Sequence, residues 1–399
     1  MLLALAGALV AVVLGLGEAA LRVLAAGHNM SVVEYEPVRG WHGRPNARLV
    51  FDQPSFSIDV AQNSLGYRDR ERAVMKPPGA VRILCCGDSF TWGWGVQQDQ
   101  IYTHLLEEMC DRTDPRTEVI NAGVSGQNTS QALLGLLDHG FAFSPDLVIY
   151  QASDNDIEGN LPASAPGIWV SPHHILGEDG ELVIRGSPVP PPTLWSDFKY
   201  RAALHSRLAY LLRHRLHILA TRMRDSRRDS VPPLGPEENP ERQARPSGWA
   251  SPDTPTAGDP ADQAFRLFCA IVVRMDRESR QRGARFAVLI DFPLSDVRQD
   301  YWNRHCGQVE AHFVNGYLVA LEKETGRRAF IERDGHWTSD GHKWIAEYLF
   351  ENVARPLVEC ERAPTLQRNA TRAGDTCRYQ GTEVPTRPTN CGIDNPHKS

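Results

Sequence analysis

Apolar segments of strand length alternate with helical segments along this chain, and that alternation limits the fold more than any other feature. Residues 81–86 (VRILCC), 118–122 (EVINA) and 146–151 (DLVIYQ) each predict a strand. Between them, apolar residues recur at helical spacing in 102–109 and 132–137. Strands that alternate with helices form parallel sheets through right-handed crossovers. We therefore predict an α/β fold with a central parallel sheet.

The same alternation resumes in the last third of the chain. We predict a helix that begins at Pro260 and ends at Gly283, because proline suits the first helical position and glycine the residue after the last. A strand at 285–291, a helix at 309–325 and a final strand at 328–331 follow. The pattern thus places these segments in the same sheet domain, which we bound at residues 81–356.

The interruption at 157–260 is interpreted as an insertion within that domain. It is rich in proline and glycine, with a helical pattern at 200–224 and a stretch at 225–260 that lacks apolar periodicity and predicts disorder. Just upstream, Gly140 is expected to end a helix in the left-handed conformation. His173 and His174 are interpreted as surface residues.

The first 27 residues predict a membrane anchor or a signal segment. No charged side chain occurs in the first 17 residues. Glu18 and Arg22 then follow one helical turn apart, where they can pair. A 17-residue helix rises roughly 25 Å, slightly less than a hydrocarbon core of about 30 Å, but continuation to residue 26 makes it long enough. A cleaved signal peptide and a buried core helix are the alternatives. The lack of a positive leading region favours an uncleaved anchor, with the globular part outside the cytoplasm.

Composition excludes some partners and leaves the redox state open. The net charge of −6 argues against a nucleic-acid partner, which usually requires a basic face.

Residues 28–80 form a polar lead-in, and residues 357–399 form a loose tail that contains cysteine. Cys85 and Cys86 are expected to be buried thiols. In an oxidising compartment, the cysteines of the last quarter would form disulfides in one of three pairings, and the sequence does not choose among Cys306, Cys360, Cys377 and Cys391.

Candidate catalytic residues fall where predicted strands end. Ser89 follows the first strand in GDSFTWGWG, a tight turn where a serine is either a nucleophile or a plain turn residue. Asp334 and His336 follow the last strand in RDGHW, and a carboxylate two residues from a histidine in a turn can orient its ring. A second Asp-x-His pair ends at His342, which is expected in the first turn of the last helix. Because the carboxyl ends of parallel strands meet at one sheet edge, we expect Ser89 and His336 to meet there.

An acyl-transfer site also needs donors for the oxyanion. Gly126 lies in NAGVSGQNTS after the second strand, where Gly123 is the alternative donor. Asn155 lies in SDND after the third strand and offers a side-chain amide, whereas Asp156 is interpreted as structural. Ser89 supplies its own backbone N–H as a third donor.

These four blocks resemble the SGNH/GDSL hydrolase superfamily, over about 81–156 and 261–353. The resemblance implies a flavodoxin-like three-layer sandwich and esterase, lipase, deacetylase or acetyltransferase chemistry without metal or cofactor. It implies that Ser89 is the nucleophile and His336 the base. It further implies that Asp334 orients His336, and that Gly126 and Asn155 are oxyanion donors.

Two departures from the superfamily pattern stand out. Ser153 occupies the position that usually holds glycine, and Asp334-Gly-His336 shortens the usual Asp-x-x-His. The short form followed by Trp337 is similar to the alginate O-acetyltransferase branch.

We therefore expect a membrane-anchored serine esterase or lipase that acts on an ester of a carbohydrate or lipid. A polysaccharide O-acetyltransferase is the first alternative. A non-catalytic subunit, with protein partners bound through the insertion and tail, is the second. Trp92 and Trp94 flank the expected mouth, where they either pack or stack on sugar rings.

Overall fold

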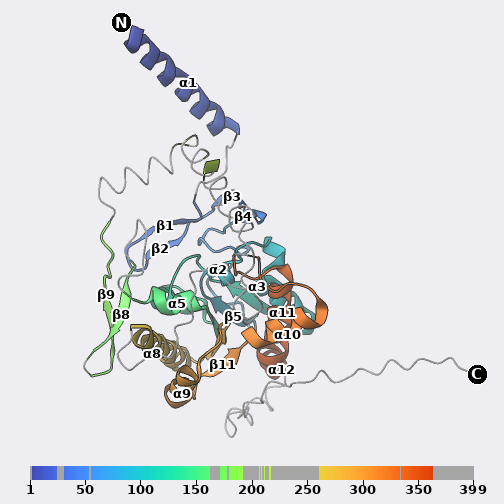
Figure 1. The fold of residues 1–399 in the computed structure, drawn as a ribbon. Coiled ribbons are helices and arrows are strands. Elements are labelled where there is room, and N and C mark those ends of the chain that lie inside the picture. The colour runs from blue at the N-terminus through green and yellow to red at the C-terminus, as the bar shows by residue number, and fades with distance from the viewer. Residues whose placement is uncertain are drawn as a thin grey trace, which may run out of the picture.

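In a computed structural model of the protein, the 23-residue helix α1 (Leu2–Leu24) precedes a sheet domain (Figure 1). The structure describes residues 2–24, 31–53, 55–161, 171–177, 179–191, 206, 208, 211, 215–216, 260–332 and 334–362. Most of the predicted helix at 200–224, the stretch at 225–259 and the tail from 363 lie outside the described residues.

The central sheet has five strands in the order β11-β10-β7-β5-β6, and every neighbouring pair is parallel. The strands are β5 (Val81–Cys86), β6 (Thr117–Asn121), β7 (Leu147–Ala152), β10 (Arg285–Ile290) and β11 (Glu310–Phe313). In chain order this is 2-1-3-4-5, the flavodoxin-like arrangement, which places ligands at the carboxyl ends of the strands. The predicted α/β fold is confirmed.

Helices cover both faces of the sheet, which gives three layers (Figure 1). One face packs against α3 (Tyr102–Thr113), α10 (Asn315–Thr325), α11 (Ser339–Leu349), η4 (Phe350–Ala354) and α12 (Arg355–Arg362). The other packs against α4 (Thr129–Asp138), α5 (Asp154–Gly159), α8 (Pro260–Gln281) and α9 (Asp296–His305). All residues of the central strands β5 and β7 are buried. Strands covered on both faces are mostly apolar, which is why the sequence pattern located them.

The C-terminal part of the sheet differs from the prediction. The segment predicted as one helix at 309–325 is strand β11 followed by α10, and the preceding α9 was not predicted. Residues 328–331 form no sheet strand and contribute only the isolated bridge between Phe330 and Trp337. All four residues of β11 are only partly buried, because it lies at the sheet edge. A half-exposed run of four residues carries too little periodicity to distinguish a strand from a helix.

Gly140 does not end a helix in the left-handed conformation; it begins the 3-10 turn η2 (Gly140–Phe143), and Ser144 adopts the left-handed angle with φ 52°. A Cβ on Gly140 would lie 2.9 Å from Leu136 Cδ1 and 3.0 Å from Leu84 Cδ2. A side chain at this position would therefore displace two buried leucine methyl groups, whereas the φ angle itself does not call for glycine.

The lead-in and the insertion contain strands that the sequence did not predict. In the lead-in, β1 (Val33–Glu36) pairs with β2 (Gly40–Gly43), and β3 (Arg48–Asp52) pairs with β4 (Ser57–Ala61), both antiparallel. In the insertion, β8 (His173–Leu176) pairs with β9 (Leu182–Arg185). His174 is buried and its pKa is lowered to about 4 by that burial, so its assignment to the surface was wrong.

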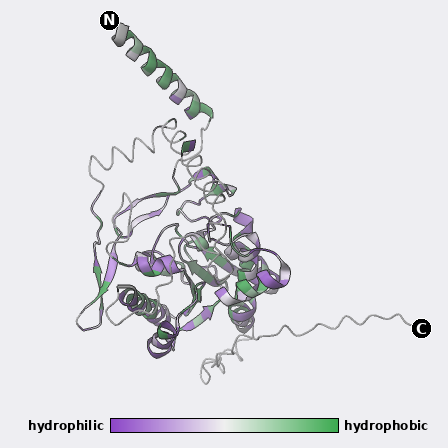
Figure 2. Ribbon diagram, viewed as in Figure 1, coloured by the Kyte–Doolittle hydropathy of each residue, from purple (hydrophilic) through white to green (hydrophobic). Residues whose placement is uncertain are grey.

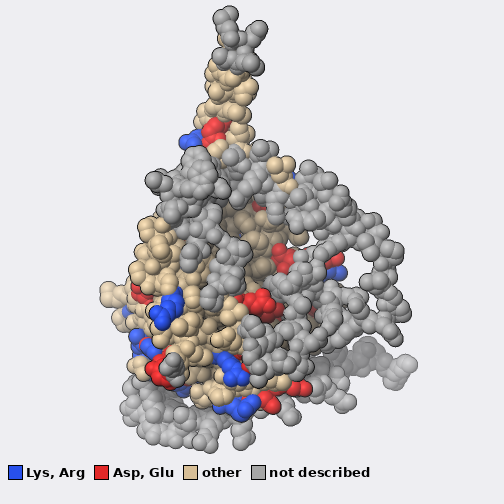
Figure 3. Space-filling view, turned by 60° about the vertical axis from the view of Figure 1, so that its left-hand side comes forward, with Lys and Arg blue, Asp and Glu red and all other residues tan. Residues whose placement is uncertain are grey.

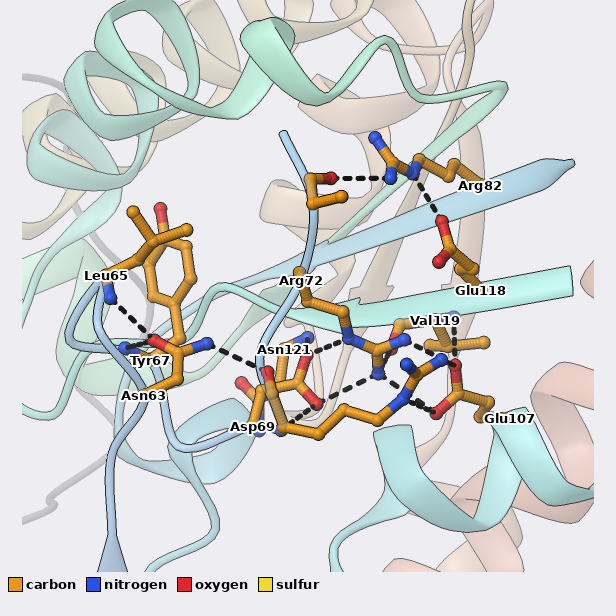
Figure 4. A network of polar contacts seen from close by, with 12 residues as sticks. Asn63, Leu65, Tyr67, Asp69, Arg72, Arg82, Glu107, Glu118, Val119 and Asn121 are labelled. Atoms are coloured by element: carbon orange, nitrogen blue, oxygen red, sulfur yellow. Dashed lines mark hydrogen bonds and ion pairs between the residues drawn. The ribbon is translucent and has the colours of Figure 1, made fainter. Parts of the chain in front are cut away.

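A buried ionic network joins the lead-in to the sheet domain (Figure 4). Arg72 donates to Asp69 Oδ2 at 2.8 Å, to Glu107 Oε1 on α3 at 2.6 Å and to the Val119 carbonyl on β6 at 2.7 Å. Asp69 Oδ2 in turn accepts from the Asn121 N–H at 3.1 Å. The lead-in is thus held against edge strand β6 by charged side chains with almost no exposure to water.

Helix α1 (Leu2–Leu24) is apolar over almost its whole length, and Leu5–Leu24 is long and apolar enough to cross a membrane (Figure 2). Within the described residues it is the one helix that meets this test. Figure 3 shows it as a nearly uncharged rod with one acidic and one basic side chain near its base. Glu18 and Arg22 pair at 2.8 Å, as their spacing predicted.

Five cysteines of the described residues are free and buried, among them Cys85 and Cys86 as expected. Cys306 caps α9 in the core, with its thiol directed at the Cys269 carbonyl at 3.9 Å. It therefore does not belong with the tail cysteines. Cys377 and Cys391 lie outside the described residues, as does the side chain of Cys360.

Candidate active site

Ser89 lies at the carboxyl end of the central strand β5, as the first residue of the short helix α2 (Ser89–Trp92). Asp88 caps this helix by accepting the Phe90 N–H at 2.9 Å. Gly87 permits the sharp turn, because a Cβ there would lie 2.5 Å from Thr91 Oγ1 and 2.9 Å from the Gln151 carbonyl. Strand, glycine and cap together project the Ser89 side chain above the sheet edge.

The structure brings Ser89, His336 and Asp334 into one hydrogen-bonded chain. Ser89 Oγ lies 2.7 Å from His336 Nε2, and His336 Nδ1 lies 2.5 Å from Asp334 Oδ1. A carboxylate accepts only, so Nδ1 carries the proton and Nε2 accepts from the serine hydroxyl. Gly335 turns the backbone between the two side chains with φ 90°, a left-handed angle that favours glycine.

The Asp334 carboxyl is held in its charged form. Burial acts to raise its pKa, but the hydrogen bonds and charge of His336, together with the Trp94 indole, outweigh burial and lower the pKa below its ordinary value. About a quarter of the Asp334 side chain remains exposed (25%), against 19% for His336. A charged carboxylate at this position stabilises a protonated imidazole.

Two aromatic rings enclose the His336 imidazole. The Phe90 ring centroid lies 4.6 Å away and that of Trp94 5.4 Å away, tilted by 31° and 29°. Trp94 Nε1 also donates to Asp334 Oδ2 at 3.2 Å, a contact that no sequence pattern indicated. Trp92 is 1% exposed and packs under the β3–β4 hairpin, so of the two alternatives for this residue the structure selects packing.

Arg68 supports this aromatic group from the lead-in. Its guanidinium donates to the carbonyls of Gly93 and Val96, which flank Trp94, and lies 4.9 Å from the Trp92 ring centre. Burial lowers its pKa to about 10. The residues around the histidine therefore come from three separate parts of the chain.

Asn155 lies beside the serine turn and is fixed by Asp88. Its Nδ2 donates to Asp88 Oδ2 at 3.1 Å, and its Oδ1 accepts from Ser153 Oγ at 2.6 Å. An amide nitrogen carries two hydrogens, so one remains for a ligand. Ser153, which replaces the expected glycine, also lies 3.0 Å from Asp88 Oδ2, so the departure adds a hydroxyl to the support of Asn155. Asp156 is buried and its Oδ2 accepts the Ser153 N–H at 2.9 Å, a structural role as expected.

Backbone hydrogen bonding distinguishes Gly123 from Gly126, the two glycines considered as oxyanion donors. The Gly123 N–H already donates to Asn121 Oδ1 at 3.0 Å. Gly126 has φ 79° with open space where a Cβ would lie, and no acceptor within the described part of the chain takes its N–H. Of the two glycines, Gly126 is therefore the one whose N–H the described residues leave unpaired.

His342 lies in the core and not at the site. It is fully buried, stacks on Tyr102 and accepts the Tyr102 N–H at 3.3 Å. Burial lowers its pKa to about 3. It occupies the first turn of α11 as expected, and Thr338 caps that helix.

One family model and several solved structures are similar to this chain. The GDSL-like Lipase/Acylhydrolase family model matches residues 85–248, less than half of the chain, and supports an acyl ester hydrolase. No curated protein matches the sequence. The chain is also similar to solved structures at low TM-scores, among them the following three.

The first is a two-domain esterase (CEX) active on acetylated mannans, with 11% identity, a TM-score of 0.34, and coverage of 71% of this chain and 51% of that one. This chain therefore spans about half the length of that esterase. The second is TesA, with 14% identity, a TM-score of 0.36, and coverage of 69% and 99%. The third is an acetyl xylan esterase, AlAXEase, with 12% identity, a TM-score of 0.32, and coverage of 68% and 100%.

Proposed function

We propose that this protein is an acyl ester hydrolase that forms an acyl-enzyme on Ser89, with His336 as general base and Asp334 as its orienting acid. The continuous hydrogen-bonded chain from Ser89 Oγ through the imidazole to Asp334 Oδ1 carries the proposal. A nucleophile, a base and an orienting group within hydrogen-bond reach are the signature of activated-serine chemistry.

In the first half-reaction, Ser89 Oγ attacks the ester carbonyl carbon while His336 Nε2 takes the hydroxyl proton. The ester C–O bond then breaks, and the imidazolium returns that proton to the leaving alcohol. In the second half-reaction, water loses a proton to Nε2 and attacks the acyl carbon. The acid product leaves, and the proton returns to Ser89.

Three N–H groups are proposed to hold the oxyanion: the backbone amides of Ser89 and Gly126, and the second hydrogen of Asn155 Nδ2. Removal of one such donor typically lowers the rate by about a hundredfold to a thousandfold. The contact with Asp88 holds the Asn155 amide in place before substrate arrives, which is the condition for effective oxyanion stabilisation.

The proposed substrate is a short acyl ester, such as an O-acetyl group, of a carbohydrate or lipid. A polysaccharide O-acetyltransferase is the second candidate, motivated by the short Asp334-Gly-His336 spacing followed by Trp337. In that case a sugar hydroxyl replaces water in the second half-reaction. The apolar α1 supports attachment to a membrane, and we propose that the sheet domain lies outside the cytoplasm.

A fluorophosphonate probe and a short aryl ester test the proposal on the full chain in detergent. We expect the wild type to be labelled and to turn over the ester, and Ser89→Ala and His336→Ala to lose both. Matched controls are Ser57→Ala on the exposed face of β4 and His104→Ala, whose side chain is 42% exposed. Absence of labelling, or labelling that survives Ser89→Ala, would overturn the proposal that Ser89 is the catalytic nucleophile.

The two chemistries separate by their products. Mass spectrometry of the acyl group after incubation with an acetylated glycan, with and without acceptor sugar, follows its transfer. Free acetate alone supports the hydrolase, and acetyl transfer that outpaces acetate release supports the transferase.

A further inference from the structure

Trp94 contacts both partners of Ser89 in the proposed catalytic chain. Its indole N–H donates to Asp334 Oδ2 at 3.2 Å, and its ring stacks on His336 with a 29° tilt. The other carboxylate oxygen, Oδ1, accepts from His336 Nδ1 at 2.5 Å and from the His336 N–H at 3.3 Å. The two oxygens of Asp334 are thus divided between the histidine and the tryptophan.

This division fixes the rotation of the carboxylate. Asp334 and His336 are separated by one glycine in an irregular turn, so no regular element orients the acid. The Asp334 side chain is partly exposed, and water competes for an oxygen that no protein group occupies. A donor on Oδ2 keeps Oδ1 directed at the imidazole.

Trp94 is itself firmly held. The N–H groups of Gly93 and Trp94 both donate to the Ser89 carbonyl, at 3.0 and 2.9 Å. Phe51 and Phe56, from the β3–β4 hairpin, pack edge-on against the indole with centroids 4.8 and 5.8 Å away. A side chain that is locked from behind can act as a fixed reference for a more exposed one.

We propose that Trp94 is a positioning residue of this site, which acts on the reaction by orienting Asp334 and, through it, His336. The inference rests on the proposed serine hydrolase function. The stacked indole face also favours a protonated imidazole, because an aromatic ring attracts a cation over its face. Trp94 does not contact the reacting atoms and does not bind substrate in this role.

Trp94→Phe tests the inference in the full chain, because it keeps an aromatic face and removes the N–H donor. A hydrogen bond to a charged group contributes about 1.5–3 kcal/mol, which corresponds to roughly a tenfold to hundredfold loss. We expect kcat for the aryl ester to fall within that range while KM changes by less than about twofold. Trp302→Phe, which makes the same change in the core beside α8, is the matched control and is expected to keep wild-type kcat.

The decisive measurement is a double-mutant cycle with Asp334→Ala, read as the rate of Ser89 labelling by the fluorophosphonate. If Trp94 acts through Asp334, adding Trp94→Phe to Asp334→Ala lowers the rate by less than about twofold. A full additional loss in that background overturns the inference, and so does an unchanged kcat in Trp94→Phe.

Replacement of Trp94 by 3-benzothienylalanine, which keeps the ring shape without the N–H, gives the same readouts if the phenylalanine variant fails to fold. A wild type that is not labelled at Ser89 overturns the proposed function and this inference together. Wild-type labelling with an unaffected Trp94 variant overturns this inference alone.

Discussion

Substitution of Arg72 by methionine is expected to destabilise the protein severely. The Arg72 side chain is 1% exposed, and its guanidinium donates to Asp69, Glu107 and the Val119 carbonyl (Figure 4). Methionine fills similar volume but leaves two carboxylates, 9% and 8% exposed, without their main cation. Removal of one partner from a buried ion pair typically costs about 3–5 kcal/mol.

That loss corresponds to a fall in melting temperature of roughly 6–20 °C, at about 2–4 °C per kcal/mol for a domain of this size. Lower pH should reduce the difference in stability between Arg72→Met and the wild type. In the wild-type protein the pKa of Glu107 is lowered: burial acts to raise it, but the hydrogen bonds and charges of Arg72 and Arg70 outweigh burial. Without Arg72 the folded-state pKa of Glu107 rises, so protonation at lower pH relieves the unpaired charge and restores part of the stability.

Thermal and urea unfolding at pH 7.5 and 5, followed by tryptophan fluorescence, measure both effects. Arg70→Met is the matched control: it removes another cation from Glu107, but its side chain is 56% exposed, so the loss should stay below about 1 kcal/mol. Equal losses for the two variants would refute the reasoning that burial decides the effect. A penalty for Arg72→Met that grows in acid would refute the assignment to unpaired carboxylates.

Three other outcomes follow from buried or strained residues. The pKa of His342 is about 3 in the fold against 6.5 as a free side chain, so the free energy of unfolding is highest above pH 6.5 and falls as the pH drops toward 3, by about 2 kcal/mol at pH 5. Urea unfolding should show a flatter pH dependence in His342→Gln. Burial, and after it the nearby Asp88 charge, raise the pKa of Asp156, so this carboxyl contributes most to stability in acid and loses that contribution as the pH rises. Asp156→Asn should therefore match or exceed wild-type stability at pH 8, and a clear loss of stability at that pH would contradict the reasoning. Gly335→Ala should lower the free energy of unfolding by about 1–3 kcal/mol, because Gly335 has a left-handed φ, and should also lower kcat. Urea unfolding measures the first effect and ester turnover the second.

The strands that the sequence located are those buried on both faces. β5 and β7 are apolar except for the buried Arg82 and Gln151, because helices cover both strands from both sides. β11 and the three hairpins escaped prediction because they are short and partly exposed, so their patterns resemble helix or loop.

The residues of the candidate site were predictable where topology alone decides position. Parallel strands bring their carboxyl ends to one edge, so the turn that carries Ser89 after β5 and Asn155 after β7 meet there, through Asp88. Trp94 could not be assigned in the same way, because its contact with Asp334 spans 240 positions and depends on side-chain direction. A tryptophan beside a cleft has several possible roles, and only the geometry chooses among them.

The buried guanidinium of Arg68 has a practical consequence for anyone who wishes to shorten or transplant this domain. It ties β4 to the loop that carries Trp94, through the carbonyls of Asp59, Gly93 and Val96. A fragment trimmed to begin at the first strand of the central sheet would lose this brace and leave the tryptophan loop without its inner support. The smallest unit to express or graft onto another scaffold therefore starts upstream of the β3–β4 hairpin.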